Sequence, residues 1–182
     1  MKGSGTVNVG AGGNLAIAGT LAAGNSPGVL SVSNGSGGTG STSFSTGSIF
    51  AWDLDTTLSG RGVGYDGVNT SAVTGSGGIF QVVLQGTQGF GDAFWSSAHT
   101  WSDIFTTNGT TPVTSDLASV FSSFSYANGG GALANPSAIG SFTLTGSSLS
   151  WSAVPEPSSA LAGLLLGAGL LRRRRSSATA AL

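Results

Sequence analysis

The sequence predicts an all-β protein: short parallel β-solenoid rungs, a β-sandwich-like extracellular domain, or both, followed by a single C-terminal transmembrane helix. Three observations support this fold class. Apolar and polar residues alternate with a period of two along many short segments, as expected of half-buried strands. Glycine accounts for 32 of the 182 residues and separates those segments with turns. One longer apolar stretch lies near the C-terminus, directly before four arginines.

Residues 1–34 are predicted to form a β-solenoid-like repeat segment. Short apolar pairs such as Val7 and Val9 recur between glycine and asparagine turns, which is typical of stacked rungs. Residues 35–47 consist mainly of glycine, serine and threonine, and this composition predicts a flexible linker. For the repeat-like stretch, a disordered low-complexity segment is the alternative.

The segment Gly19–Gly28 reads GTLAAGNSPG. It resembles the G-T-L-x-P-G-N-S-P-G element of autotransporter-like passenger repeats, with Ala23 in place of the proline. The resemblance covers about ten residues and implies one rung of a parallel β-helix.

Residues 48–153 are predicted to form a β-rich extracellular domain. Large apolar residues alternate over 50–54 and again over 80–84, and a further alternation on both sides of Gly146 predicts a closing hairpin. Before this hairpin, apolar residues spaced i, i+3, i+4 and i+7 predict a helix, with Ser115 or Asp116 as its N-cap. The residues of this helical stripe are Leu117, Val120, Phe121 and Phe124.

The segment 154–175 differs from the rest of the chain. It begins with Val154, Pro155, Glu156 and Pro157, continues with the apolar stretch 158–171, and ends with Arg172, Arg173, Arg174 and Arg175. A helix over Ala160–Leu171 would be about 18 Å long, shorter than the roughly 30 Å hydrocarbon core of a bilayer. Local bilayer thinning and snorkelling arginines accommodate this difference, so we expect a short membrane span followed by a cytoplasmic tail at 176–182. A buried core helix or hairpin is the alternative.

This order of a Val-Pro-Glu-Pro motif, a short Gly/Ala/Leu span and an arginine cluster resembles the PEP-CTERM sorting signal of Gram-negative bacteria. The resemblance implies export, transient membrane anchoring, and recognition by an exosortase, a membrane-bound cysteine transpeptidase that acts near the motif at Pro155, Glu156 and Pro157. It also implies an association with extracellular polysaccharide. The body would then be periplasmic or extracellular, with the arginines cytoplasmic during export, and the protein would end at the cell surface or outside the cell.

The amino terminus contains no export signal of the ordinary kind. Met1–Gly5 leads directly into repeat-like sequence, whereas a signal peptide has basic residues followed by 7–15 apolar ones. We therefore expect the sequence to be a fragment of a longer exported protein.

The composition argues against several classes of function. Charged residues make up 7% of the chain, and residues 1–153 contain only Lys2 and Arg61 against six aspartates, so binding to nucleic acid is not expected. The chain has no cysteine and one histidine, which excludes zinc fingers, CxxC redox sites and thiol nucleophiles. We expect no cofactor, no catalytic residue and no enzymatic activity.

The residue pattern nonetheless suggests two binding sites. Asp53 and Asp55 fall on one face of a predicted strand, where two carboxylates and backbone oxygens can hold Ca²⁺. Trp95 and Trp101 lie in polar surroundings, as sugar-stacking rings often do. Two alternative functions follow: a carbohydrate-binding β-sandwich module that uses these tryptophans, or the C-terminal remnant of a secreted hydrolase.

Overall fold

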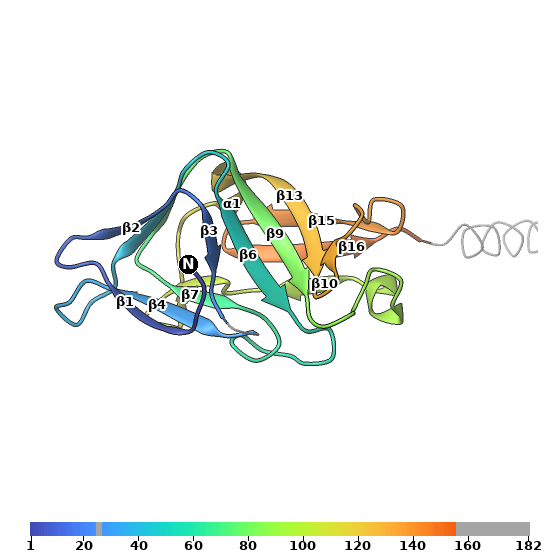
Figure 1. The fold of residues 1–182 in the computed structure, drawn as a ribbon, viewed down its shortest axis with the longest axis horizontal. Helices are drawn as coiled ribbons and strands as arrows, with labels where there is room; N and C mark the ends of the chain where they lie inside the picture. Colours follow the sequence, from blue (N-terminus) through green and yellow to red (C-terminus); the bar gives the residue numbers. More distant parts are fainter. Residues whose placement is uncertain (25–26, 156–182) are drawn as a thin grey trace, which may run out of the picture.

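The computed structural model describes residues 1–24 and 27–155, and they are mostly β (Figure 1). The prediction of an all-β protein is thus confirmed for this part of the chain. Within the described residues no helix combines the length and the apolar character needed to cross a membrane. The predicted span 158–171 lies outside them.

The chain winds through successive coils, each made of three strands. The first coil contains β1 (Gly5–Asn8), β2 (Asn14–Ile17) and β3 (Thr20–Ala22). The second contains β4 (Val29–Ser33), β5 (Ser41–Phe44) and β6 (Ile49–Leu54). The third contains β7 (Gly67–Asn69), β8 (Val73–Gly75) and β9 (Gly78–Leu84). In the last coil, β11 (Phe105–Thr107) is followed by α1 (Leu117–Val120) and β13 (Phe121–Asn128).

Equivalent strands of successive coils pair in parallel and build three sheets. The strand orders are β1-β4-β7-β11-β12, β2-β5-β8, and β14-β13-β9-β6-β3, where β12 (Thr111–Pro112) and β14 (Gly131–Ala132) are short antiparallel additions. Some rows of the stack are mixed, such as Leu15, Thr42 and Val73, but in others the register places polar side chains on polar ones or apolar on apolar. One such polar row consists of Thr6, Ser31, Asn69 and Thr106.

The predicted segments 1–34 and 35–47 therefore share their sheets with strands from 48–153 and are not separate from that domain. The prediction of a flexible linker over 35–47 is wrong for Ser41–Phe44, because this segment forms β5 and pairs in parallel with strands on both sides. Thr42 and Phe44 point inward and are 0% and 2% exposed. Serine and threonine make this alternation hard to recognise in the sequence, because both carry hydroxyls and an inward threonine looks like an outward serine.

The core between the sheets is aromatic. Leu21, Phe50, Phe80 and Phe124 occupy one row of the sheet that contains β3, β6, β9 and β13. Phe50 is fully buried, and its ring centroid lies 5.4 Å from that of Phe80 and 4.9 Å from that of Phe105. These rings fill the space that the coils enclose.

The predicted helix over the stripe 117–124 is shorter than its spacing suggests. Helix α1 covers only Leu117–Val120, and its N-cap is Asp116, whose carboxylate accepts a hydrogen bond from the Ala118 amide at 3.2 Å. Phe121 begins β13, which pairs in parallel with β9, with a register shift between Phe121 and Ser123. The stacking of this coil on the one before it overrides the local helical pattern.

An antiparallel sheet covers one end of the coils. Its strands are β10 (His99–Trp101), β16 (Ser148–Ala153) and β15 (Gly140–Thr145), and the short 3₁₀ helix η1 (Ala93–Ser96) lies beside β16. Strands β15 and β16 form the predicted closing hairpin, with Gly146 in the turn at a φ of 56°. In Figure 1 this sheet lies at the right, and β1 and β2 lie at the left.

Candidate functional site

The C-terminal motif begins where the folded body ends. Strand β16 ends at Ala153, and the amide of Val154 still donates a hydrogen bond to the Ile139 carbonyl at 2.8 Å. Val154 is 53% exposed, and Pro155 is the last described residue. The other predicted sorting residues, Glu156, Pro157 and the block from Arg172 to Arg175, lie outside the described part.

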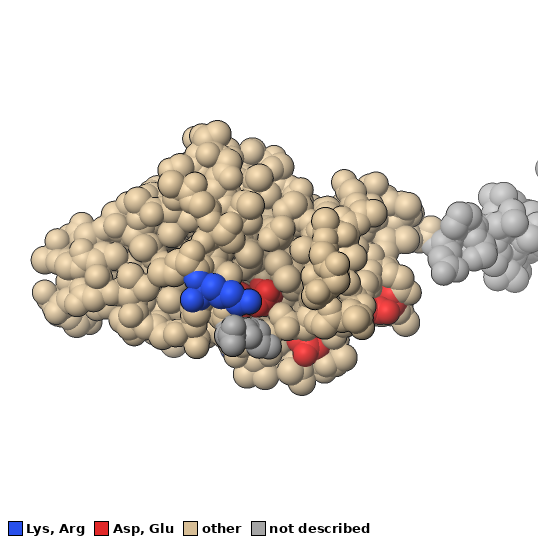
Figure 2. All heavy atoms as spheres, viewed as in Figure 1, with Lys and Arg blue, Asp and Glu red and all other residues tan. Residues whose placement is uncertain are grey.

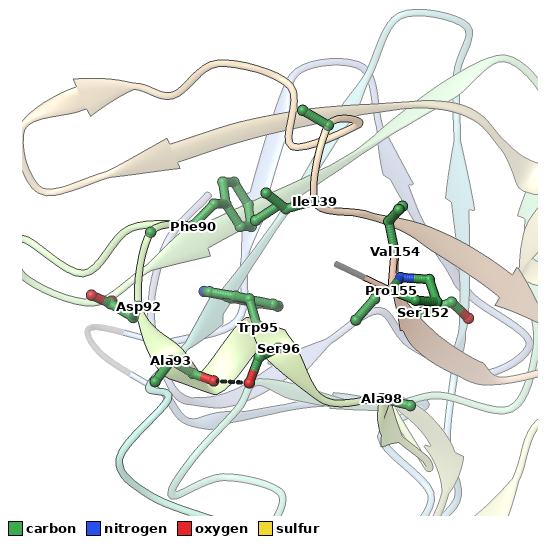
Figure 3. A pocket seen from close by; sticks show the side chains of 13 residues that line it. Phe90, Asp92, Ala93, Trp95, Ser96, Ala98, Ile139, Ser152, Val154 and Pro155 are labelled. Carbon is green, nitrogen blue, oxygen red and sulfur yellow. Dashed lines mark hydrogen bonds between the residues drawn. The ribbon is translucent and has the colours of Figure 1, made fainter. Parts of the chain in front are cut away.

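A cavity of about 840 Å³ lies beside this junction, between η1 and the ends of β15 and β16 (Figure 3). Its apolar lining includes Phe90, Trp95, Ile139, Val154 and Pro155. Asp92 is the only charged residue that lines it among the described ones. The cavity can therefore accept an apolar side chain or an apolar segment next to the motif.

Little in the sequence predicts this cavity. Its lining residues come from two stretches that lie about fifty positions apart, and only the packing of η1 against β16 brings them together. The available signal was that Ile139 and Val154 are large apolar residues in turn-rich sequence. They are exposed to 38% and 53%.

Trp95 and Trp101 are not sugar-stacking platforms, and this corrects the prediction from sequence. They are only 2% and 7% exposed. The Trp95 ring lies 4.9 Å from the Phe94 ring and 5.0 Å from the Trp151 ring, and its indole N–H donates to the Gly89 carbonyl at 3.0 Å. A sugar needs a free ring face, so the carbohydrate-binding module that was based on these two tryptophans loses its support.

Asp53 and Asp55, the candidate calcium ligands, have separate roles. Oδ1 of Asp55 accepts hydrogen bonds from the amide and hydroxyl of Thr57, at 2.8 and 2.6 Å, and from Nε2 of Gln88 at 3.0 Å. These hydrogen bonds lower the pKa of Asp55, and the bond from the Thr57 hydroxyl has the largest effect. Asp53 is instead buried, which raises its pKa. In residues 1–24 and 27–155 no three acidic or histidine side chains gather as a metal site requires.

Asp66 is the most unusual titratable residue in the described part, and no pattern in the sequence points to it. Its side chain is fully buried; Oδ1 accepts from the Gly28 amide at 2.8 Å and Oδ2 from the Asp53 amide at 3.1 Å. Burial raises the pKa of Asp66 to about 7, and the nearby charge of Asp53 acts in the same direction. The carboxyl thus connects the beginning and the end of the second coil to the start of the third.

One outer face of the coils carries a shallow polar groove of about 380 Å³. At its centre, Oδ1 of Asn69 accepts from Arg61 at 2.8 Å and from Thr106 at 3.0 Å, and its Nδ2 donates to the Ser31 hydroxyl at 2.9 Å. The groove is lined by hydroxyls, amides and glycine backbone, with Val32 the only large apolar residue and no charged residue among the described lining. Figure 2 shows a face of the body on which most side chains are uncharged and the few basic and acidic ones are scattered.

Comparison with known proteins gives no relative: no family model, no curated protein and no solved structure matches this chain.

Proposed function

We propose that this chain is an exported surface or extracellular-matrix protein, sorted by an exosortase through its C-terminal segment 154–175. Its role would be structural or adhesive, in a biofilm or an exopolysaccharide, and not enzymatic. The observation that carries this proposal is the order of three features in the sequence: the Val154–Pro157 motif, the apolar stretch 158–171, and the arginines from Arg172 to Arg175. Membrane, exosortase and extracellular polysaccharide are the partners, with the body outside the cytoplasm and the arginines inside it during export.

The junction at β16 supports this proposal. Ala153 ends the last strand and Val154 is held by Ile139, so the motif starts within two residues of the folded body. A processing enzyme at the membrane surface would therefore meet the motif directly against the body and its apolar cavity. Release after processing would leave the coils intact, because every described strand precedes the motif.

The polar faces of the coils support an association with uncharged polysaccharide. The row of Thr6, Ser31, Asn69 and Thr106 and the groove around it offer hydroxyl and amide groups in place of charges. Neutral sugars are recognised by such donors and acceptors, and acidic or nucleic-acid partners would require a basic patch. The only basic residues of the body are Lys2 and Arg61, and the Arg61 side chain already donates a hydrogen bond to Asn69.

Replacing Glu156 by glutamine is expected to block release. The substitution preserves size and removes only the charge between the two prolines, so the precursor should accumulate in the membrane fraction. The measurement is the ratio of membrane-bound to released protein in cells that contain an exosortase. Asp103→Asn is the matched control, because it removes one carboxylate from the body at a φ of 60°, which asparagine tolerates. Normal release of the Glu156→Gln variant would contradict exosortase processing.

A further inference from the structure

The outer face of strands β1, β4 and β7 forms the floor of the polar groove. Val32 points inward and is fully buried, so its neighbours Ser31 and Ser33 point outward on β4. The register places Thr6 of β1 on one side of Ser31 and Asn69 of β7 on the other. Three outward polar side chains therefore follow one another across three adjacent strands, at intervals of about 4.8 Å.

The floor of the groove is held by its own hydrogen bonds, and these leave donors for a ligand. Oδ1 of Asn69 already accepts two hydrogen bonds, so its amide has only the second N–H to offer. Ser31 accepts from Nδ2 of Asn69, and Ser33 accepts from the Gly35 amide at 3.1 Å. Neither serine hydroxyl has an acceptor for its own proton among the described residues. The floor thus presents N–H and O–H donors in fixed positions.

Two turns bound the groove on one side. The turn after β4 is closed by Asn34, whose Oδ1 accepts from the Ser36 and Gly38 amides, both at 3.0 Å. The turn after β11 contains Asn108 and Gly109, whose φ angles of 54° and 83° are those of a tight hairpin turn. Strands β4 and β11 run in the same direction on the two sides of β7, so both turns lie at one edge of the sheet. The groove is therefore a ledge that runs across the strands, along the stack of coils.

Other groups of the groove can both donate and accept. The hydroxyls of Thr6 and Thr39 and the side-chain amide of Asn108 have no hydrogen-bond partner among the described residues. None of the described lining residues is charged, and residues 1–153 contain two basic residues against six aspartates. A cation would require carboxylates in the groove, and a polyanion would be repelled by the net charge of the body. The lining therefore fits a neutral ligand rich in hydroxyl and ether oxygens.

We propose that this groove binds an extended, neutral, β-linked hexose chain, with successive sugar units on Thr6, Ser31 and Asn69. The inference rests on the proposed association with polysaccharide, and it adds the site, the direction and the linkage. A glycan that lies across the strands meets a new coil about every 4.8 Å. This interval is close to the rise per unit of an extended cellulose-type chain, whereas α-linked glucose chains coil and do not keep it. Thr39 and Asn108 then contact hydroxyls along one edge of the glycan.

Cello-oligosaccharides of increasing length test the direction of binding. The full chain is purified in a detergent without a sugar head group and titrated calorimetrically with members from glucose to the hexasaccharide. Affinity should rise up to the trisaccharide, because each of the three coils adds contacts, and it should change little beyond that length. Equal affinity for glucose and the trisaccharide, or no binding of any member, would overturn the proposal. Tighter binding of alginate, an acidic polysaccharide, would contradict a neutral ligand.

Valine substitutions locate the site on the body. Thr6→Val and Thr39→Val each remove one hydroxyl, keep the shape of the side chain and break no side-chain hydrogen bond within the described residues. Each should weaken binding of the trisaccharide roughly fivefold, which corresponds to about one hydrogen bond. Thr20→Val is the matched control, because Thr20 is an exposed residue of the same first coil on β3, in a different sheet. It should bind like the wild type. Equal losses in all three variants, or no loss in Thr6→Val and Thr39→Val, would place the glycan elsewhere. Circular dichroism checks that the variants fold.

The glycan site and the proposed sorting have separate readouts. Release that depends on Glu156, together with no glycan binding, would contradict the groove and leave exosortase sorting unaffected. Glycan binding that is insensitive to Thr6→Val and Thr39→Val would contradict this site and still support an association with polysaccharide. Length-dependent binding that both substitutions weaken would support the groove even if release did not depend on Glu156.

Discussion

The free energy of unfolding of the Asp66→Asn variant should fall below that of the wild type by much more at pH 4.5 than at pH 8. Burial raises the pKa of Asp66 to about 7 from an ordinary value of 3.8. Between these values the folded protein retains a proton that the unfolded chain has released, so the wild-type free energy of unfolding falls as the pH rises from about 4 to about 7. A shift of this size corresponds to roughly 4 kcal/mol. Asparagine does not titrate and removes this slope.

The variant should still be less stable than wild type below pH 5. The amide oxygen of asparagine can accept from only one of the Gly28 and Asp53 amides, which leaves the other without an acceptor and costs about 1–3 kcal/mol. Urea unfolding at several pH values gives both curves. Parallel curves for wild type and Asp66→Asn would show that Asp66 does not keep its proton.

Phe50→Ala should destabilise the body by about 3–5 kcal/mol, the cost of a large cavity in a core. The Phe50 ring is fully buried, with the Phe44, Phe80 and Phe105 rings at centroid distances of 6.1, 5.4 and 4.9 Å. Because these residues come from different coils, none can move into the vacated space without disturbing the stack of strands. Thermal or urea unfolding measures the loss.

Phe124→Ala is the matched control for this change. Phe124 belongs to the same row of the same sheet as Phe50, but it lies toward the capped end and is only half-buried. Its truncation should cost clearly less, since solvent can enter the space that the ring leaves. Equal losses in the two variants would contradict the placement of Phe50 at the centre of the core.

Local sequence patterns predicted many of the strands correctly, and there are physical reasons why the other elements were missed. The alternation over 50–54 and 80–84 and the hairpin around Gly146 predicted β6, β9 and the β15–β16 pair correctly. Strand β5 was hidden because an inward Thr42 does not look like a core residue, although its hydroxyl lies 3.0 Å from that of Thr70. The helix at 117–124 was overestimated because pairing with β9 decides the conformation from Phe121 onward.

The candidate sites depended more on long-range contacts, and fewer of them could be predicted. Polar neighbours in sequence suggested exposure for Trp95, yet Trp151 and Phe142 bury it from other segments. The chemistry of Asp66 depends on the Gly28 amide, 38 positions away, and no spacing rule points to it. The Val154–Pro157 motif, by contrast, is a local pattern, and sequence alone was enough to propose its role.

The uneven ends of the body give the molecule a direction. The described chain ends beside β16 at the covered end of the body, and β1 lies toward the opposite end (Figure 1). The polar row of Thr6, Ser31, Asn69 and Thr106 runs from coil to coil along this direction. In a molecule tethered through its C-terminus, the row would present hydroxyl and amide groups at several distances from the tether and not at one level only.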